Sequence, residues 1–170
     1  MEKGRDVVEN ATWTPNLYVR NCDFGPTEGR GILATTRGEV IIENNRFRNL
    51  WGPALLIEDD CNFWFESGYT REIIFRNNTV INCEYASMWE GSPVIRYSPK
   101  VMDETSTDFV HGRLTLTGNT FSLPKEEKHR IYLESLKEAH IANNIFDNLY
   151  EIVSKCVGSI YDENNIVKEA

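Results

Sequence analysis

The chain has 170 residues and a formal charge of −8, because 26 Asp and Glu side chains outnumber 18 Lys and Arg. This length is enough for one domain with a substantial core, and the excess of acids argues against a nucleic-acid partner, whose phosphates require a basic stripe. No stretch of 18 apolar residues occurs, so the sequence predicts no helix that crosses a membrane.

An eight-residue pattern recurs six times along the chain. In every copy the eighth residue is Phe or Val, and in five copies the sixth is Asn, with Cys22 in its place in the first. The copies occupy 17–24, 40–47, 73–80, 114–121, 139–146 and 160–167. Successive sixth positions are 23, 33, 41, 25 and 21 residues apart. Such spacing is typical of a solenoid with loops inserted on one face.

A second set of strand-like segments alternates with the first, at 31–38, 54–61, 93–100, 130–137 and 151–158. The second residue of each segment is apolar and is predicted to face inward. Strand alternation then turns the fifth residue outward. These outward residues are Thr35, Glu58, Tyr97, Glu134 and Lys155.

The two sets together predict an all-β fold, a right-handed parallel β-helix of about six coils over 17–167, preceded by a lead-in over 1–16. We expect 1–170 to form one domain, as part of a larger enzyme. Coils stack at about 4.8 Å, so the repeated Asn, from Asn45 to Asn165, is predicted to form an amide ladder at a bend that needs left-handed backbone. An antiparallel sandwich with Asn-rich turns is the alternative.

Three consecutive acids, Glu58, Asp59 and Asp60, lie within the second of these segments, 54–61, and precede several aromatic residues. Glycosidases need one carboxyl as proton donor and a second as base or nucleophile, while aromatic rings stack on the sugar. Insertions at 61–71, 83–91 and 102–112 are predicted to wall the acids into a cleft. Candidates for its lining include Trp51, Trp64, Phe65, Tyr69, Trp89 and Tyr97. A structural role for the acids, such as pairing with Arg37, is the alternative.

Three segments carry a more specific resemblance: NATWTPNLYVRNCDF, RGILATTRGEVIIENNRFRNLWGPALLIEDDCNFWFESG and REIIFRNNTVINC. Over about residues 8–100 the chain resembles the β-helix of glycoside hydrolase family 110, the exo-acting α-1,3-galactosidases. The resemblance implies hydrolysis of terminal α-linked galactose with inversion, and no metal or other cofactor. It implies that Asp59 and Asp60 are catalytic. The pocket residues that it implies are Arg30, Arg37, Trp64 and Glu66.

The second catalytic group stays open at this point, because an inverting pair holds its carboxyls roughly 6.5–9.5 Å apart and adjacent acids can lie closer. Glu66 is therefore a further catalytic candidate, and Glu58 with Glu134 is another pair. The predicted substrate-binding residues are Arg30, Arg37, Glu58, Trp64, Trp89, Tyr97 and Glu134.

Four cysteines, Cys22, Cys61, Cys83 and Cys156, lack the spacing of a metal site. We expect buried free thiols, with one disulfide as the alternative.

The expected partner is a galactose-terminated glycan, with neither nucleic acid nor membrane, and the strand edges of the end coils are a possible route to self-association. Residues 1–13 lack the apolar run of a signal peptide. The secreted or periplasmic location that we expect for the parent protein is therefore inferred from this substrate class alone. The alternative functions are a non-catalytic sugar-binding relative, a polysaccharide lyase with calcium at the acids, and a structural solenoid.

Overall fold

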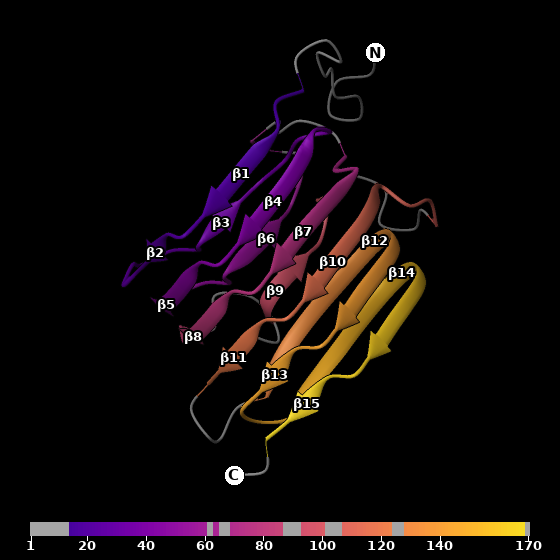
Figure 1. The fold of residues 1–170 in the computed structure, drawn as a ribbon. Coiled ribbons are helices and arrows are strands. Elements are labelled where there is room, and N and C mark those ends of the chain that lie inside the picture. The colour runs from indigo at the N-terminus through magenta and orange to yellow at the C-terminus, as the bar shows by residue number, and fades with distance from the viewer. Residues whose placement is uncertain are drawn as a thin grey trace.

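The computed structural model describes residues 14–60, 63–64, 69–86, 93–100, 107–123 and 128–168. These residues form fifteen strands that pair only in parallel. The chain winds as a right-handed β-helix, from the indigo first coil to the yellow last coil (Figure 1). Within the described ranges, no helix has the length and apolar character needed to span a bilayer. The predicted fold is confirmed.

The coils contribute strands to three faces. The first face contains β1 (Leu17–Arg20), β4 (Glu39–Glu43), β7 (Glu72–Arg76), β10 (His111–Thr117) and the later parts of β12 (His129–Ala142) and β14 (Tyr150–Glu163). The second contains β2 (Asp23–Phe24), β5 (Arg46–Leu50), β8 (Thr79–Cys83), β11 (Thr120–Ser122), β13 (Ile145–Phe146) and β15 (Ile166–Val167). The third contains β3 (Ile32–Leu33), β6 (Leu55–Ile57), β9 (Pro93–Tyr97) and the earlier parts of β12 and β14.

Apolar columns fill the interior between these faces, as the repeat predicts. On the first face the register stacks Leu17, Val40, Ile73, Leu114, Ala139 and Ile160. On the second face it stacks Phe24, Phe47, Val80, Phe121, Phe146 and Val167. Phe121 and Phe146 lie parallel with ring centroids 4.9 Å apart. A side chain in such a column packs against its counterparts one coil above and below, which explains why the eighth position stays apolar.

The predicted amide ladder joins the first and second faces. Asn78 Oδ1 accepts hydrogen bonds from the backbone N–H (2.9 Å) and the Nδ2 (3.1 Å) of Asn45, and the same arrangement repeats at Asn119, Asn144 and Asn165. Each Nδ2 also donates to a backbone carbonyl of the first face, as Asn119 does to Phe75 O at 3.0 Å. The ladder thus satisfies buried backbone groups at a corner where the sheet hydrogen bonds are interrupted.

The left-handed residue at this corner is the one before the ladder, which corrects the expectation that the ladder Asn itself adopts that conformation. Positive φ angles occur at Asn21, Asn44, Asn77, Gly118, Asn143 and Asn164. Asn and Gly tolerate this backbone region better than other residues. The two tasks are therefore divided between neighbours, with the first residue turning the chain and the second bonding between coils.

A second corner connects the third face to the first. In β12 and β14 the chain bends without leaving the ladder, at Ser135 (φ 56°) and Cys156 (φ 53°). Ile57 pairs with Tyr97, and Tyr97 pairs with Leu133. Two residues further along, Asp59 (φ 44°) therefore occupies the same bend position as Ser135. One of the predicted catalytic acids therefore lies at a bend of the helix.

The register of β9 differs from the sequence alignment. Arg130 opposes Pro93 but Ile131 opposes Ile95, so a bulge shifts the strand by one residue. Ile95 and Tyr97 consequently occupy the inward positions of Leu55 and Ile57 on β6. The prediction that Tyr97 faces outward and lines a cleft is wrong, since its side chain is fully buried in the core.

The cysteines also depart in part from expectation. Cys83 is buried, Cys156 is half-buried and Cys22 is exposed, and all three are free thiols. Burial raises the pKa of the Cys83 thiol to about 12, so it behaves as an apolar core residue. Cys61 lies outside the described residues.

Candidate active site

The three acids lie where β6 ends and the second corner begins. Only 7% of Glu58, 6% of Asp59 and 3% of Asp60 is exposed. Ionised carboxylates are costly to bury unless charges or hydrogen bonds compensate them. The groups around each acid therefore indicate whether its carboxyl is protonated or ionised.

Lys100 lies against two of the acids. Its Nζ is 3.0 Å from Glu58 Oε1 and 3.9 Å from Asp60 Oδ2. Its backbone N–H also donates to Glu58 O at 2.8 Å, which extends the pairing of β6 with β9. Asp60 Oδ1 accepts the backbone N–H of Phe63 at 2.8 Å. Both contacts favour the ionised form of Asp60.

Asp59 instead faces a buried polar network behind the corner. His111 Nδ1 lies 3.4 Å from Asp59 Oδ2 and 3.1 Å from Thr70 Oγ1. The backbone N–H of Thr70 donates to the same Nδ1 at 3.2 Å, and Thr70 Oγ1 also bonds the Tyr97 hydroxyl. The Tyr97 and His111 rings pack edge to face at 4.7 Å. The Thr70, Tyr97 and His111 side chains thus come from the two coils that follow the coil of Asp59.

Burial sets the protonation of this network. It lowers the pKa of His111 to about 3, so the imidazole is neutral at physiological pH. Burial raises the pKa of Tyr97 and keeps its hydroxyl protonated. The groups behind Asp59 are thus uncharged, whereas those around Asp60 include a cation.

Glu134 stands two coils further along the same outward row as Glu58, with Ser98 between them. Its Oε2 accepts from Ser98 Oγ at 2.9 Å and from the Tyr132 hydroxyl at 3.2 Å, and Lys155 Nζ lies 2.8 Å from its Oε1. Burial acts to raise the pKa of Glu134, but the bonds from Lys155 and Ser98 outweigh it and lower that pKa. Glu134 is therefore an ionised acceptor, suited to hydrogen-bonding a sugar hydroxyl.

Basic and aromatic candidates lie beside the acids. Arg37 follows Leu33 by four residues, as Asp60 follows its register partner Leu56, and its guanidinium lies 5.0 Å from the centre of the Tyr69 ring. Trp64 is 69% exposed and packs edge to face with Phe63 at 5.2 Å. An exposed indole of this kind offers a flat surface to a sugar ring.

Not every predicted residue joins this cluster. Arg30 precedes β3 and lies by register beside Pro53, at the opposite end of β6 from the acids. The six residue steps from Pro53 to Asp59 span roughly 20 Å in extended chain. Glu66 and Trp89 fall outside the described residues. Across the ranges that the structure describes, no group of three or more His, Cys, Asp or Glu side chains is placed to hold a metal.

Sequence reasoning missed Lys100, Ser98, Thr70 and His111 as neighbours of the acids. One signal for the first two was present. If Val94 and every second residue of β9 faced inward, the Arg96 side chain would enter the core. If the alternate residues face inward instead, Ile95 and Tyr97 are buried and Arg96 stays outside. This second arrangement places Ser98 beside Glu58 and Lys100 beside Asp60 in the register of β6 and β9. For His111 no local signal existed, because it is 52 residues from Asp59 in the chain.

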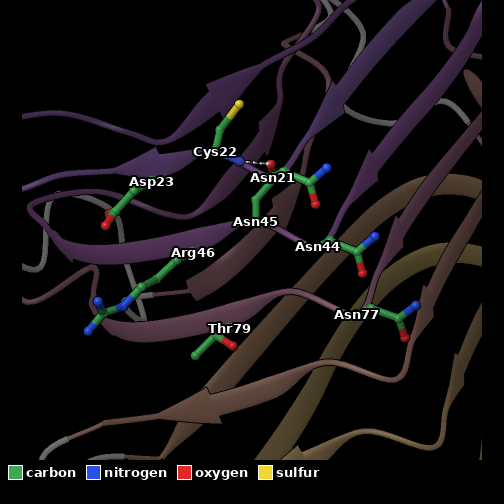
Figure 2. Close-up of a pocket in the computed structure, with 8 residues that line it drawn as sticks. All are labelled: Asn21, Cys22, Asp23, Asn44, Asn45, Arg46, Asn77 and Thr79. Atoms are coloured by element: carbon green, nitrogen blue, oxygen red, sulfur yellow. Dashed lines mark hydrogen bonds between the residues drawn. The ribbon is translucent and has the colours of Figure 1, made fainter.

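A separate polar pocket of about 480 Å³ lies at the Asn corner. Figure 2 shows its lining, with the side chains of Asn21, Asn44 and Asn77 in a row and the backbone N–H of Cys22 bonded to Asn45. This pocket is at the carboxyl ends of β1, β4 and β7, whereas Asp59 contacts His111 at the amino end of β10. It contains none of the predicted site residues.

Comparison with known proteins agrees with this architecture. The model of the family described as "Right handed beta helix region" matches residues 10–96. Alpha-1,3-galactosidase A of Akkermansia muciniphila is 40% identical over 128 residues, which cover 74% of this chain and 20% of that protein. Alpha-1,3-galactosidase A of Bacteroides fragilis is 39% identical over 123 residues, covering 71% and 20%. Alpha-1,3-galactosidase B of Bacteroides thetaiotaomicron is 38% identical over 118 residues, covering 69% and 19%.

The chain spans about a fifth of the length of these relatives. The resemblance to α-1,3-galactosidases that residues 8–100 carry is confirmed by the names of these relatives.

Proposed function

The chain belongs to the right-handed β-helix family, and from that premise we propose that it is the active-site segment of a glycoside hydrolase that removes terminal α-linked galactose. The observation that carries the proposal is the buried pair Asp59 and Asp60, whose carboxyls have different surroundings. The similarity to proteins named α-1,3-galactosidase supports the choice of sugar.

The proposed reaction inverts the anomeric centre. One carboxyl donates its proton to the glycosidic oxygen as the bond from that oxygen to the anomeric carbon breaks. The other carboxylate takes a proton from a water whose oxygen bonds to the anomeric carbon on the opposite face. A neutral acid and an ionised base must therefore coexist in one site, which neighbouring groups of different charge favour.

Sugar recognition is assigned to the half-buried and exposed groups around the pair. Arg37 and Glu134 are charged and partly accessible, so they are suited to the galactose hydroxyls, while Trp64 offers an aromatic surface. Glu58 and Lys100 form an ion pair beside Asp60 and hold its carboxyl in position. A location outside the cytoplasm belongs to the same proposal, because it follows from the substrate class.

The test is hydrolysis of an aryl α-galactoside by the protein and by Asp60→Asn. We expect release of β-galactose as the first product, and a loss of kcat/KM of about 10³-fold or more in the variant, because its amide accepts no proton from water. Asp23→Asn is the matched control, since Asp23 is exposed and pairs only with Arg48 at 2.9 Å among the contacts described; we expect it to keep full activity.

Other outcomes decide between the alternatives. Galactose binding without hydrolysis would support a non-catalytic sugar-binding protein. Calcium-dependent cleavage that yields an unsaturated product would support a polysaccharide lyase. Full activity in folded Asp60→Asn would refute the role given to that carboxyl.

A further inference from the structure

The orientation of His111 bears on which aspartate carries the proton. A backbone N–H can only donate, and the N–H of Thr70 points at His111 Nδ1 from 3.2 Å. Nδ1 therefore carries a lone pair, and the single proton of the neutral ring lies on Nε2. Nε2 is buried and, within the part of the chain that the structure describes, has no hydrogen-bond partner. In this orientation the Nε2–H donor is buried and unsatisfied, which costs stability. The Nδ1 acceptor of the same ring faces Thr70 and Asp59.

The same lone pair faces a carboxyl oxygen. Asp59 Oδ2 lies 3.4 Å from Nδ1, so an ionised Asp59 would set two acceptors against each other inside the protein. A protonated Asp59 removes the repulsion and supplies an O–H that points toward an acceptor. A neutral imidazole in this tautomer therefore favours the carboxylic acid over the carboxylate.

We propose that His111 is a positioning residue that keeps Asp59 protonated, so that Asp59 is the proton donor and Asp60 the base of the galactosidase reaction. This inference rests on the proposed function, whose two carboxyls it distinguishes. The His111 side chain is fully buried and therefore out of reach of a bound sugar. It acts through the carboxyl that it faces.

The other charged and titratable neighbours agree with this division. On the same segment as Asp59 lie Glu58 and Asp60, whose negative charges favour a neutral Asp59. From other elements, Tyr97 presents a neutral hydroxyl through Thr70, and the cation of Lys100 lies with Glu58 and Asp60. Arg37, one coil earlier, lies over the Tyr69 ring.

The proton balance follows from these assignments. The proton of Asp59 moves to the glycosidic oxygen as its bond to the anomeric carbon breaks, and Asp60 takes one proton from the attacking water. After one turnover Asp59 is ionised and Asp60 is protonated. Exchange with solvent water restores the starting state, so no further reactant is needed.

The first experiment reads the tautomer directly and needs no activity. Long-range ¹H–¹⁵N correlation spectra of ¹⁵N-labelled protein distinguish the nitrogens of each histidine, and loss of one set of signals in His111→Phe assigns His111. We expect a neutral ring protonated at Nε2 from pH 5 to pH 9. A ring protonated at Nδ1, or at both nitrogens, would overturn the proposal, because it would donate to Asp59 and favour the carboxylate.

The second experiment measures kcat/KM for an aryl α-galactoside against pH. In His111→Phe the ring remains but the lone pair is lost, so Asp59 should ionise earlier and the high-pH limb should move to lower pH by about one unit, with KM changed less than about twofold. The matched control is His129→Phe, which alters a second fully buried histidine that contacts Asp147 instead of the acids. We expect the control to keep the wild-type profile.

The outcomes separate the two proposals. An unmoved high-pH limb in folded, active His111→Phe would overturn the role of His111 while leaving the galactosidase proposal intact. A wild-type protein that shows the Nε2–H ring but hydrolyses no galactoside would overturn the proposed function instead. If His111→Phe fails to fold, the ring protonation in the wild-type protein still decides the inference, with the signals of the other two histidines assigned by His129→Phe and by substitution of the half-buried His140.

Discussion

At the scale of single residues, the protein buries histidines beside carboxylates in two places. His111 faces Asp59, and His129 Nε2 lies 2.7 Å from Asp147 Oδ1. Burial lowers the pKa of both rings, and for His129 the bond to Asp147 only partly opposes this effect. Both imidazoles are therefore held neutral, which links the stability of the fold to pH.

The sign of this linkage follows from proton uptake. An exposed histidine in the unfolded chain titrates near 6.5, whereas the pKa of His111 in the folded protein is about 3. Between these values the unfolded state binds more protons, so the free energy of unfolding falls as the pH falls. The stability that His111 contributes is complete above about pH 6.5 and is lost as the pH drops toward 3.

We therefore expect acid sensitivity above the range where carboxylates titrate. Between pH 6 and pH 5 the free energy of unfolding in urea should fall with a slope approaching about 1.4 kcal/mol per pH unit for His111 alone. His129 should add to this slope. His111→Phe should remove its own share. The opposite slope of a protonated Asp59 is common to both proteins, so a wild-type slope no steeper than that of His111→Phe would contradict the buried, neutral state of His111.

At the scale of elements, the amide ladder determines how coils join. Asn119 is fully buried, donates to Phe75 O and Asn144 Oδ1, and accepts from the backbone and side chain of Asn78. Asn165 makes equivalent bonds to Asn144 and Ile141 but is only half-buried. The same side chain thus has different access to water at two positions of one ladder.

This difference predicts unequal effects of the same substitution. Asn119→Ala leaves buried backbone groups of Asn78 and Phe75 without partners and should lower the free energy of unfolding by about 3 kcal/mol or more. Asn165→Ala exposes the corresponding groups to water and should cost about 1 kcal/mol. Urea unfolding of both variants measures the difference. Equal losses would show that the ladder does not act through buried hydrogen bonds.

Strands and corners could be predicted from the sequence wherever successive coils carry the same residue pattern. The inward columns and the ladder follow from the spacing of Phe and Asn, because parallel stacking forces equal positions into contact. The register of β9 did not follow, since a bulge adds one residue that the repeat cannot reveal. That single shift turned Tyr97 from an expected cleft residue into a core residue, and it brought Ser98 and Lys100 to the acids.

At the scale of the whole molecule, winding brings distant segments to one site. Asp59 follows β6 and His111 begins β10, two strands of different faces, and Lys100 reaches the acids from the following coil. The acids could be predicted because they are contiguous and resemble a known motif. His111 and Thr70 could not, because insertions of unequal length separate them from the acids. Self-association through coil ends stays a prediction.

The most direct test of the account is a crystal structure of the protein with galactose bound. We expect the sugar beside Asp59 and Asp60, with its anomeric carbon within reach of both carboxyls, and with Arg37 or Glu134 on its hydroxyls. Galactose in the polar pocket of Asn21, Asn44 and Asn77, with the acids untouched, would contradict the claim that stacked coils gather these carboxyls into a sugar site.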